Sequence, residues 1–191
     1  MAISDKLWKR VAVGLAIASI AWFLFDGLIA QRDPALDAQS AADRAFEDGD
    51  YGRALNLYTD RVALEPTNPF ALRGVAQSLL QLGRPGEALT AFAAAIAAEP
   101  DFGGTYANRG ILHDRLGSYE LAIADYARAM ELDPEIAEGP HWMTRFLRNQ
   151  SDAPPTIADR LGYLRAELAK PEDERVLRVP EEDAEQRPYQ Q

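Results

Sequence analysis

Residues 103–136 read GGTYANRGILHDRLGSYELAIADYARAMELDPEI, a 34-residue block with the spacing of two successive helices. Residues 69–102 repeat its pattern, and residues 35–68 repeat it more weakly. A fixed period of this length is typical of stacked helical hairpins, because one hairpin cannot bury its apolar face alone. Four columns align in all three blocks: Gly49, Gly83 and Gly117; Ala54, Ala88 and Ala122; Tyr58, Phe92 and Tyr126; Pro66, Pro100 and Pro134.

Each column has a physical role in a helical hairpin. The glycine can adopt the left-handed conformation that ends the first helix. The alanine fits where two helices approach closely, and the aromatic ring one turn later fills the space between helices. The proline is expected to stop the second helix and start the next one. The pattern therefore predicts an all-α chain with helices at 35–48, 51–64, 69–82, 85–98, 103–116 and 119–131.

This pattern resembles the tetratricopeptide repeat family. Block one is the weakest match, since Arg61 stands in a column where the family prefers alanine. The resemblance implies a solenoid of three repeats plus C-terminal helices, in which the first helices line a groove for an extended peptide or a partner helix. The matching residues of block three are Tyr106, Gly110, Gly117, Tyr119, Ala122, Tyr126, Ala129 and Pro134.

The resemblance also implies which side chains face the groove. Arg73, Gln77 and Asn108 loosely match part of the clamp by which some family members hold a peptide carboxylate. Glu138 and Trp142 then stand where basic residues would be needed, so a mixed apolar and polar groove is expected instead. The alternative is that these are ordinary solvated helix residues. The predicted groove residues are Phe70, Arg73, Gln77, Leu80, Gln81, Asn108, Ile111 and Asp114.

Two further helices are expected after the repeats. One at 135–149 should cap the solenoid through Trp142, Met143 and Phe146. A second begins at Thr156 with a capping-box-like Asp159 and ends at Pro171. The charged tail then carries one apolar cluster, which is either solvated or a docking segment that folds on a partner or back onto the repeats. Its apolar residues are Val176, Leu177 and Val179.

The N-terminus has the composition of a membrane anchor. Residues 11–30 are almost all apolar and number about the twenty that a spanning helix needs. Basic residues Lys6, Lys9 and Arg10 precede them, which favours a cytoplasmic N-terminus with the repeats on the far side. A cleaved signal peptide, a buried soluble helix and the reversed topology are the alternatives. The predicted organisation is 1–10 cytoplasmic, 11–30 a transmembrane signal anchor, 31–150 the solenoid, and 151–191 a linker, amphipathic helix and charged tail.

Composition restricts the classes of function. The formal charge is −10, which argues against nucleic-acid binding, and the chain has no Cys and only two His. No phosphate loop, nucleophile elbow or metalloprotease motif is present. The sequence therefore predicts that the protein is not an enzyme and that it binds no cofactor, metal ion or small-molecule substrate.

Abundant Ala and Arg, with Lys only at positions 6, 9 and 170, suggest a bacterial source. The predicted function is a scaffold or assembly factor anchored in the inner membrane, with its soluble domain in the periplasm. The alternative is a permanent small subunit of a larger membrane complex.

Overall fold

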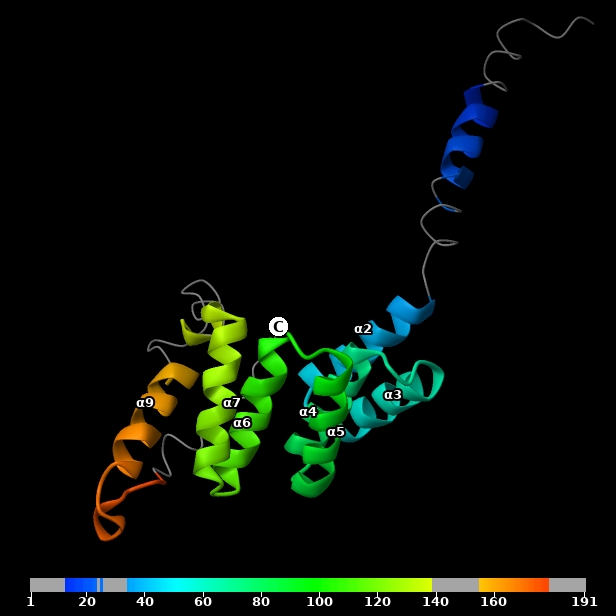
Figure 1. Cartoon of the computed structure of the whole chain (residues 1–191). Helices are drawn as coiled ribbons and strands as arrows, with labels where there is room; N and C mark the ends of the chain where they lie inside the picture. The colour runs from blue at the N-terminus through cyan, green and yellow to red at the C-terminus, as the bar shows by residue number, and fades with distance from the viewer. Residues whose placement is uncertain (1–12, 24, 26–33, 139–154, 179–191) are drawn as a thin grey trace, which may run out of the picture. The chain divides into compact units, whose positions relative to one another are not determined.

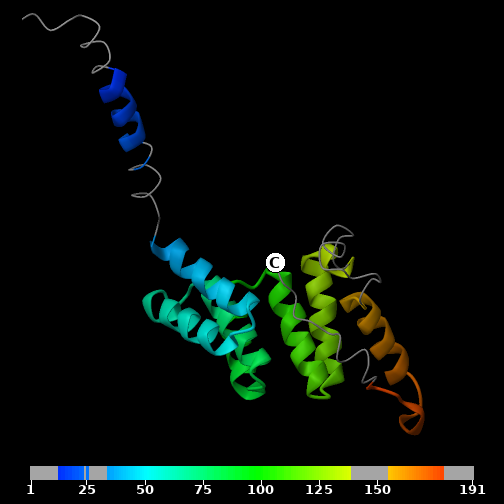
Figure 2. The same ribbon diagram turned by 180° about the vertical axis from the view of Figure 1, so that it is seen from behind.

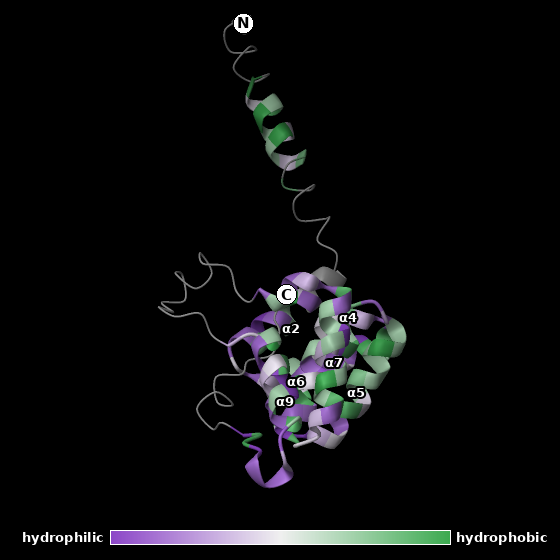
Figure 3. Cartoon of the chain, turned by 60° about the vertical axis from the view of Figure 1, so that its left-hand side comes forward, coloured by the Kyte–Doolittle hydropathy of each residue, from purple (hydrophilic) through white to green (hydrophobic). Residues whose placement is uncertain are grey.

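The computed structural model describes residues 13–23, 25, 34–138 and 155–178, and for residues 34–38 it describes the backbone alone. The chain divides into two compact units, Met1–Ser40 and Ala41–Gln191, and each is described by itself. The first unit contains a helix over residues 13–23 (Figure 1). Figure 3 colours this helix mostly as hydrophobic. Its large apolar side chains, with that of residue 25, are 59–79% exposed: Val13, Leu15, Ile17, Ile20, Trp22, Phe23 and Phe25.

The predicted transmembrane segment 11–30 falls partly outside the described residues, as do Lys6, Lys9 and Arg10. Within the described ranges, no helix combines the length and the hydropathy that crossing a bilayer requires.

The second unit is built from helical hairpins. Helices α4 and α5 form one hairpin and α6 and α7 the next, and the two lie side by side in both views (Figures 1 and 2). Every predicted boundary of these helices agrees with the structure to within one residue. The observed bounds are α2 Pro34–Glu47, α3 Tyr51–Leu64, α4 Pro69–Gln81, α5 Pro85–Ala98, α6 Gly103–Arg115 and α7 Tyr119–Leu132.

The aligned glycines close the first helix of each repeat. Gly49, Gly83 and Gly117 have φ angles of 78°, 68° and 74°, a region that side chains other than glycine rarely adopt. The prolines behave only partly as predicted. Pro66 and Pro100 lie two residues after a helix ends but three residues before the next begins, so they stop one helix without starting another.

The alanine and aromatic columns form the core that joins the hairpins. Ala54, Ala88 and Ala122 are all 0% exposed. Phe92 is also fully buried, in a cluster that includes Leu112 of the following repeat. Contacts of this kind across repeats are why neighbouring hairpins stabilise one another.

The predicted cap of the solenoid is described only at its start. Residues Pro134–Ala137 form a short 3-10 helix, η1, where a longer helix was expected, and the remainder of that predicted helix (Trp142, Met143 and Phe146 included) lies outside the described residues. Helix α9, Ile157–Leu168, packs on α7. It begins with the predicted capping box, in which Thr156 and Asp159 each accept a hydrogen bond from the other's backbone N–H. Its apolar face can cover the last hairpin because Leu161 and Leu164 lie one turn apart.

Candidate functional site

Half of the predicted groove residues lie along one face of α4. The helix starts cleanly because Pro69 occupies its first turn and the Asn68 side chain accepts a hydrogen bond from the Ala71 N–H at 3.1 Å. From there, intervals of three and four residues keep side chains on one side of the helix. Phe70, Arg73, Gln77 and Gln81 follow these intervals, and all four are half-buried.

Arg73 is already paired within the chain. Its guanidinium forms an ion pair with Glu99, the residue that caps the end of α5. The same group lies 4.1 Å from the centre of the Phe102 ring and 5.8 Å from that of Phe70. Its side chain is only 12% exposed. Arg73 therefore links α4 to the corner between α5 and α6, and its charge is balanced before any ligand arrives.

The other predicted groove residues offer almost no surface. Leu80 is 5% exposed, Asn108 1%, Ile111 3% and Asp114 4%. Helix α9 covers part of this set, since Ile111 packs in the same cluster as Leu161 and Leu164. The structure therefore separates the predicted residues into an accessible group on α4 and a buried group.

Asp114 is held by an arginine that sequence reasoning missed. Arg160 of α9 donates two hydrogen bonds to the Asp114 carboxylate, at 2.7 and 2.8 Å. The hydroxyl of Tyr126 donates a third at 3.3 Å, and burial raises the pKa of that phenol. Two features of the sequence could have indicated this pair. Arg160 stands next to an apolar position of the amphipathic helix predicted after Thr156, and Asp114 stands at a predicted groove position of the last repeat.

The predicted docking tail lies against the chain's own helices where it is described. The Val176 N–H donates to the Glu167 carboxylate at 2.8 Å, and the Tyr163 hydroxyl donates to the Val176 carbonyl at 2.5 Å. Arg160 donates to the Leu177 carbonyl at 3.0 Å. Val179, the third predicted residue, lies outside the described residues.

The two side chains of this segment have different surroundings. Leu177 is half-buried and packs against the cluster formed by α6, α7 and α9. The side chain of Val176 points to solvent and is 56% exposed. Hydrogen bonds from Lys170 and from the Val176 N–H lower the pKa of Glu167, so its carboxylate remains an acceptor at neutral pH.

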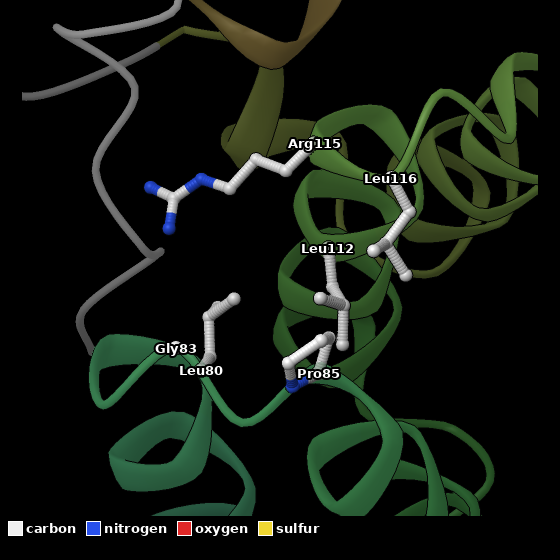
Figure 4. A pocket seen from close by; sticks show the side chains of 6 residues that line it. All are labelled: Leu80, Gly83, Pro85, Leu112, Arg115 and Leu116. Atoms are coloured by element: carbon white, nitrogen blue, oxygen red, sulfur yellow. The ribbon is translucent and has the colours of Figure 1, made fainter.

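A shallow pocket opens where the hairpin of α4 and α5 meets the hairpin of α6 and α7. It has a volume of about 220 Å³ and lies between the turn at Gly83 and the C-terminal end of α6. Figure 4 shows Leu112 of α6 and Leu116, the residue after that helix, among the side chains that line the pocket, with Arg115 extending toward the side where Leu80 lies. The lining is mainly apolar, so the pocket suits an aliphatic side chain better than a charged ligand. In the described part of the chain, no group of acidic, His or Cys side chains is placed to hold a metal ion.

Comparison with known proteins identifies the family. The tetratricopeptide repeat model matches residues 40–101 and 74–137, which together span just over half of the chain. The chain belongs to the tetratricopeptide repeat family. The matched repeats are a protein-interaction module of a family whose role is noncovalent binding, as the sequence predicted.

This chain is similar to only a part of each of its relatives. The Protein SGT1 homolog of rice (Oryza sativa subsp. japonica) is 30% identical over 136 residues, which is 71% of this chain and 35% of the relative. The DnaJ homolog subfamily C member 7 homolog of Dictyostelium discoideum is 29% identical over 97 residues, 49% of this chain and 18% of the relative. The chain thus spans about a third or less of these two proteins.

Solved structures agree on the fold. The first TPR domain of Spaghetti (RPAP3), bound to the HSP90 peptide SRMEEVD, superposes with a TM-score of 0.56 at 23% identity. The match covers 71% of this chain and 94% of that one. The first TPR domain of human RPAP3 gives a TM-score of 0.52 at 25% identity and covers 69% and 95%. The predicted helical solenoid is confirmed by these matches.

Proposed function

We propose that this protein holds a partner protein at a membrane, with α4 as the main contact surface. The observation that carries the proposal is the row of four half-buried side chains on one face of α4, in a chain whose family binds proteins. An aromatic ring and two amides suit an extended peptide or a helix, because amides can both donate to and accept from a peptide backbone. This surface comprises Phe70, Arg73, Gln77 and Gln81, and we call it the α4 face.

The chemistry of the α4 face argues against an acidic peptide ligand. RPAP3 is known with the acidic HSP90 peptide SRMEEVD, and a peptide is therefore a reasonable class of ligand for this chain too. Here, however, Arg73 is neutralised by Glu99 and packed on Phe102. Releasing the arginine for a ligand carboxylate would cost that internal pair. The proposed ligand is therefore a segment of mixed apolar and neutral polar residues.

The proposed membrane attachment rests on the N-terminal segment. Seven large apolar side chains between residues 13 and 25 are more than half exposed, and an exposed apolar surface of this kind is costly in water. Insertion of residues 11–30 as a single-pass anchor would remove that cost. The basic residues before it favour a cytoplasmic N-terminus, with the repeats in the periplasm of a bacterial cell.

Site-specific photocrosslinking in cells tests the α4 face. A photoreactive residue at Gln81 on α4 is compared with one at Thr90, an exposed position on α5 of the same repeat. The proposal predicts a discrete protein adduct from position 81 that is absent from position 90. Equal labelling from both positions, or none from position 81, would contradict it. An adduct that also migrates at fixed stoichiometry with a large membrane complex would identify the permanent-subunit alternative.

A reporter fusion tests the orientation separately. A reporter active only in the periplasm, fused after Gln191, should be active, and one active only in the cytoplasm should be silent. The opposite pattern would place the repeats in the cytoplasm. It would not affect the proposal that the α4 face binds a partner protein.

A further inference from the structure

We propose that α9, together with the C-terminal end of α6, forms a second peptide site that accepts an extended segment carrying leucine followed by a basic residue. In the structure this site is occupied by the chain's own residues 176–178. A partner segment with the same pattern can take their place. The site is separate from the α4 face, so either proposal can fail without the other.

The contacts to residues 176–178 are those of a peptide receptor rather than of a helix pair. Arg160, Tyr163 and Glu167 follow one another at intervals of three and four along α9, so they lie on one side of the helix. Together they bind three polar groups of two adjacent residues in the extended segment: the Val176 N–H, the Val176 carbonyl and the Leu177 carbonyl. Contacts to backbone groups hold an extended chain whatever its side chains are.

The side-chain contacts supply the selectivity. Leu177 enters the apolar cluster that contains Ile111, Leu161 and Leu164, so a leucine-sized side chain fits that position. The guanidinium of Arg178 donates to the Arg115 carbonyl at 3.1 Å. Arg115 is the last residue of α6, where the helix dipole favours a positive charge. The preferred sequence is therefore any residue, then leucine, then arginine or lysine.

The receptor is anchored more firmly than its occupant. Leu161 and Leu164 of α9 are 5% and 0% exposed, and Arg160 is 6% exposed. Of the occupant, Leu177 is only half-buried, and the residues before it, 169–174, are all exposed. Because little apolar surface secures the occupant, it can leave while α9 stays in place.

A labelled peptide with the sequence of residues 171–178, PEDERVLR, tests the exchange on the full chain in mild detergent. Leu177→Asp removes the internal anchor and should vacate the site. Val176→Asp is the matched control, since it adds the same charge one residue earlier on an exposed side chain whose backbone contacts remain. Fluorescence anisotropy then measures the dissociation constant of the peptide for the wild type and each variant.

The expected result is binding at least about tenfold tighter to the Leu177→Asp chain than to the wild type or the Val176→Asp chain, because a tethered occupant competes at high effective concentration. A peptide with aspartate in place of its leucine should bind none of them. Equal binding to all three chains, or no binding to the Leu177→Asp chain, would overturn the proposal. If the Leu177→Asp chain loses its helical circular dichroism signal, Leu177→Ala, which adds no charge, replaces it. The same difference in peptide binding is then expected for the Leu177→Ala chain.

Discussion

Arg160 on α9 and Asp114 on α6 form a buried ion pair that joins the C-terminal helix to the last repeat. Two hydrogen bonds of 2.7 and 2.8 Å connect them, and their side chains are 6% and 3% exposed. A charge this well buried is tolerated only when it is paired. The pair therefore holds α9 at one position on the last repeat. In that position α9 covers part of the surface that the sequence predicted to be an open groove.

Removing one partner of this pair should destabilise the protein strongly. Arg160→Ala leaves the Asp114 carboxylate buried without its cation, and we expect a loss of roughly 3–5 kcal/mol in the free energy of unfolding. Arg128→Ala is the control, because Arg128 pairs with Glu131 on the exposed surface and should matter by less than about 1 kcal/mol. Denaturant unfolding followed by circular dichroism measures both. Similar losses for the two variants would show that the buried pair has no special role.

The apolar anchor of α9 should be equally measurable. Leu164 is 0% exposed, so Leu164→Ala should leave a cavity and cost about 2–5 kcal/mol. Leu121 on α7 is 54% exposed, and Leu121→Ala should change stability by less than about 0.5 kcal/mol. If Leu164→Ala proved as mild as Leu121→Ala in denaturant titrations, α9 would not be packed as described.

Gly110 of α6 lies directly against the ring of Tyr126 on α7. A Cβ at position 110 would lie 2.7 Å from the Tyr126 ring, so Gly110→Ala should overpack the hairpin and cost about 1–3 kcal/mol. Gly86 on α5 has nothing within 4 Å of the same atom. Gly86→Ala should therefore be neutral or stabilise the helix by up to about 1 kcal/mol. The midpoint of thermal unfolding, measured for both, should move down for the first and not for the second.

Stability should fall in mild acid because of His113. Burial lowers the pKa of this imidazole in the folded protein, with Arg109 acting in the same direction and Asp125 opposing them. The unfolded state, with a pKa of about 6.5, then binds more protons than the folded state. The free energy of unfolding should decrease as the pH falls through that value. Unfolding measured between pH 5 and 8 should show a smaller decrease for His113→Asn, and an identical slope would contradict the assignment.

The ends of the helices could be predicted closely because particular residues in the sequence mark them. The glycine columns require a left-handed backbone at the turn inside each hairpin, and the proline columns mark the end of each second helix, so both helices of a repeat end at a local signal. The capping box of Thr156 and Asp159 did the same for α9. The helix predicted at 135–149 is only partly testable: its described start is a short 3-10 helix, Pro134–Ala137, and residues 139–149 lie outside the described part of the chain. Helical apolar spacing alone did not indicate that α9 would also pack on the last repeat.

The candidate site was predictable only where it depends on one helix. The four residues on α4 were expected from the groove positions of the resembled family, and their placement on one face needs only the helical spacing of a single repeat. The burial of Ile111 and Asp114 depends on α9, which returns some forty residues later in the chain, and a local pattern contains no information about that contact. The internal pairing of Arg73 likewise required the position of Glu99 in space.

Copurification in mild detergent after crosslinking in cells tests whether the α4 face binds the partner protein. Three full chains are compared: the wild type, Gln77→Ala with Gln81→Ala on the α4 face, and Glu87→Ala with Thr90→Ala on exposed positions of α5. The account predicts a partner protein recovered by the wild type and the α5 variant and lost from the α4 variant. Equal recovery by all three chains, or recovery by none, would contradict the assignment of the α4 face as the partner-binding surface.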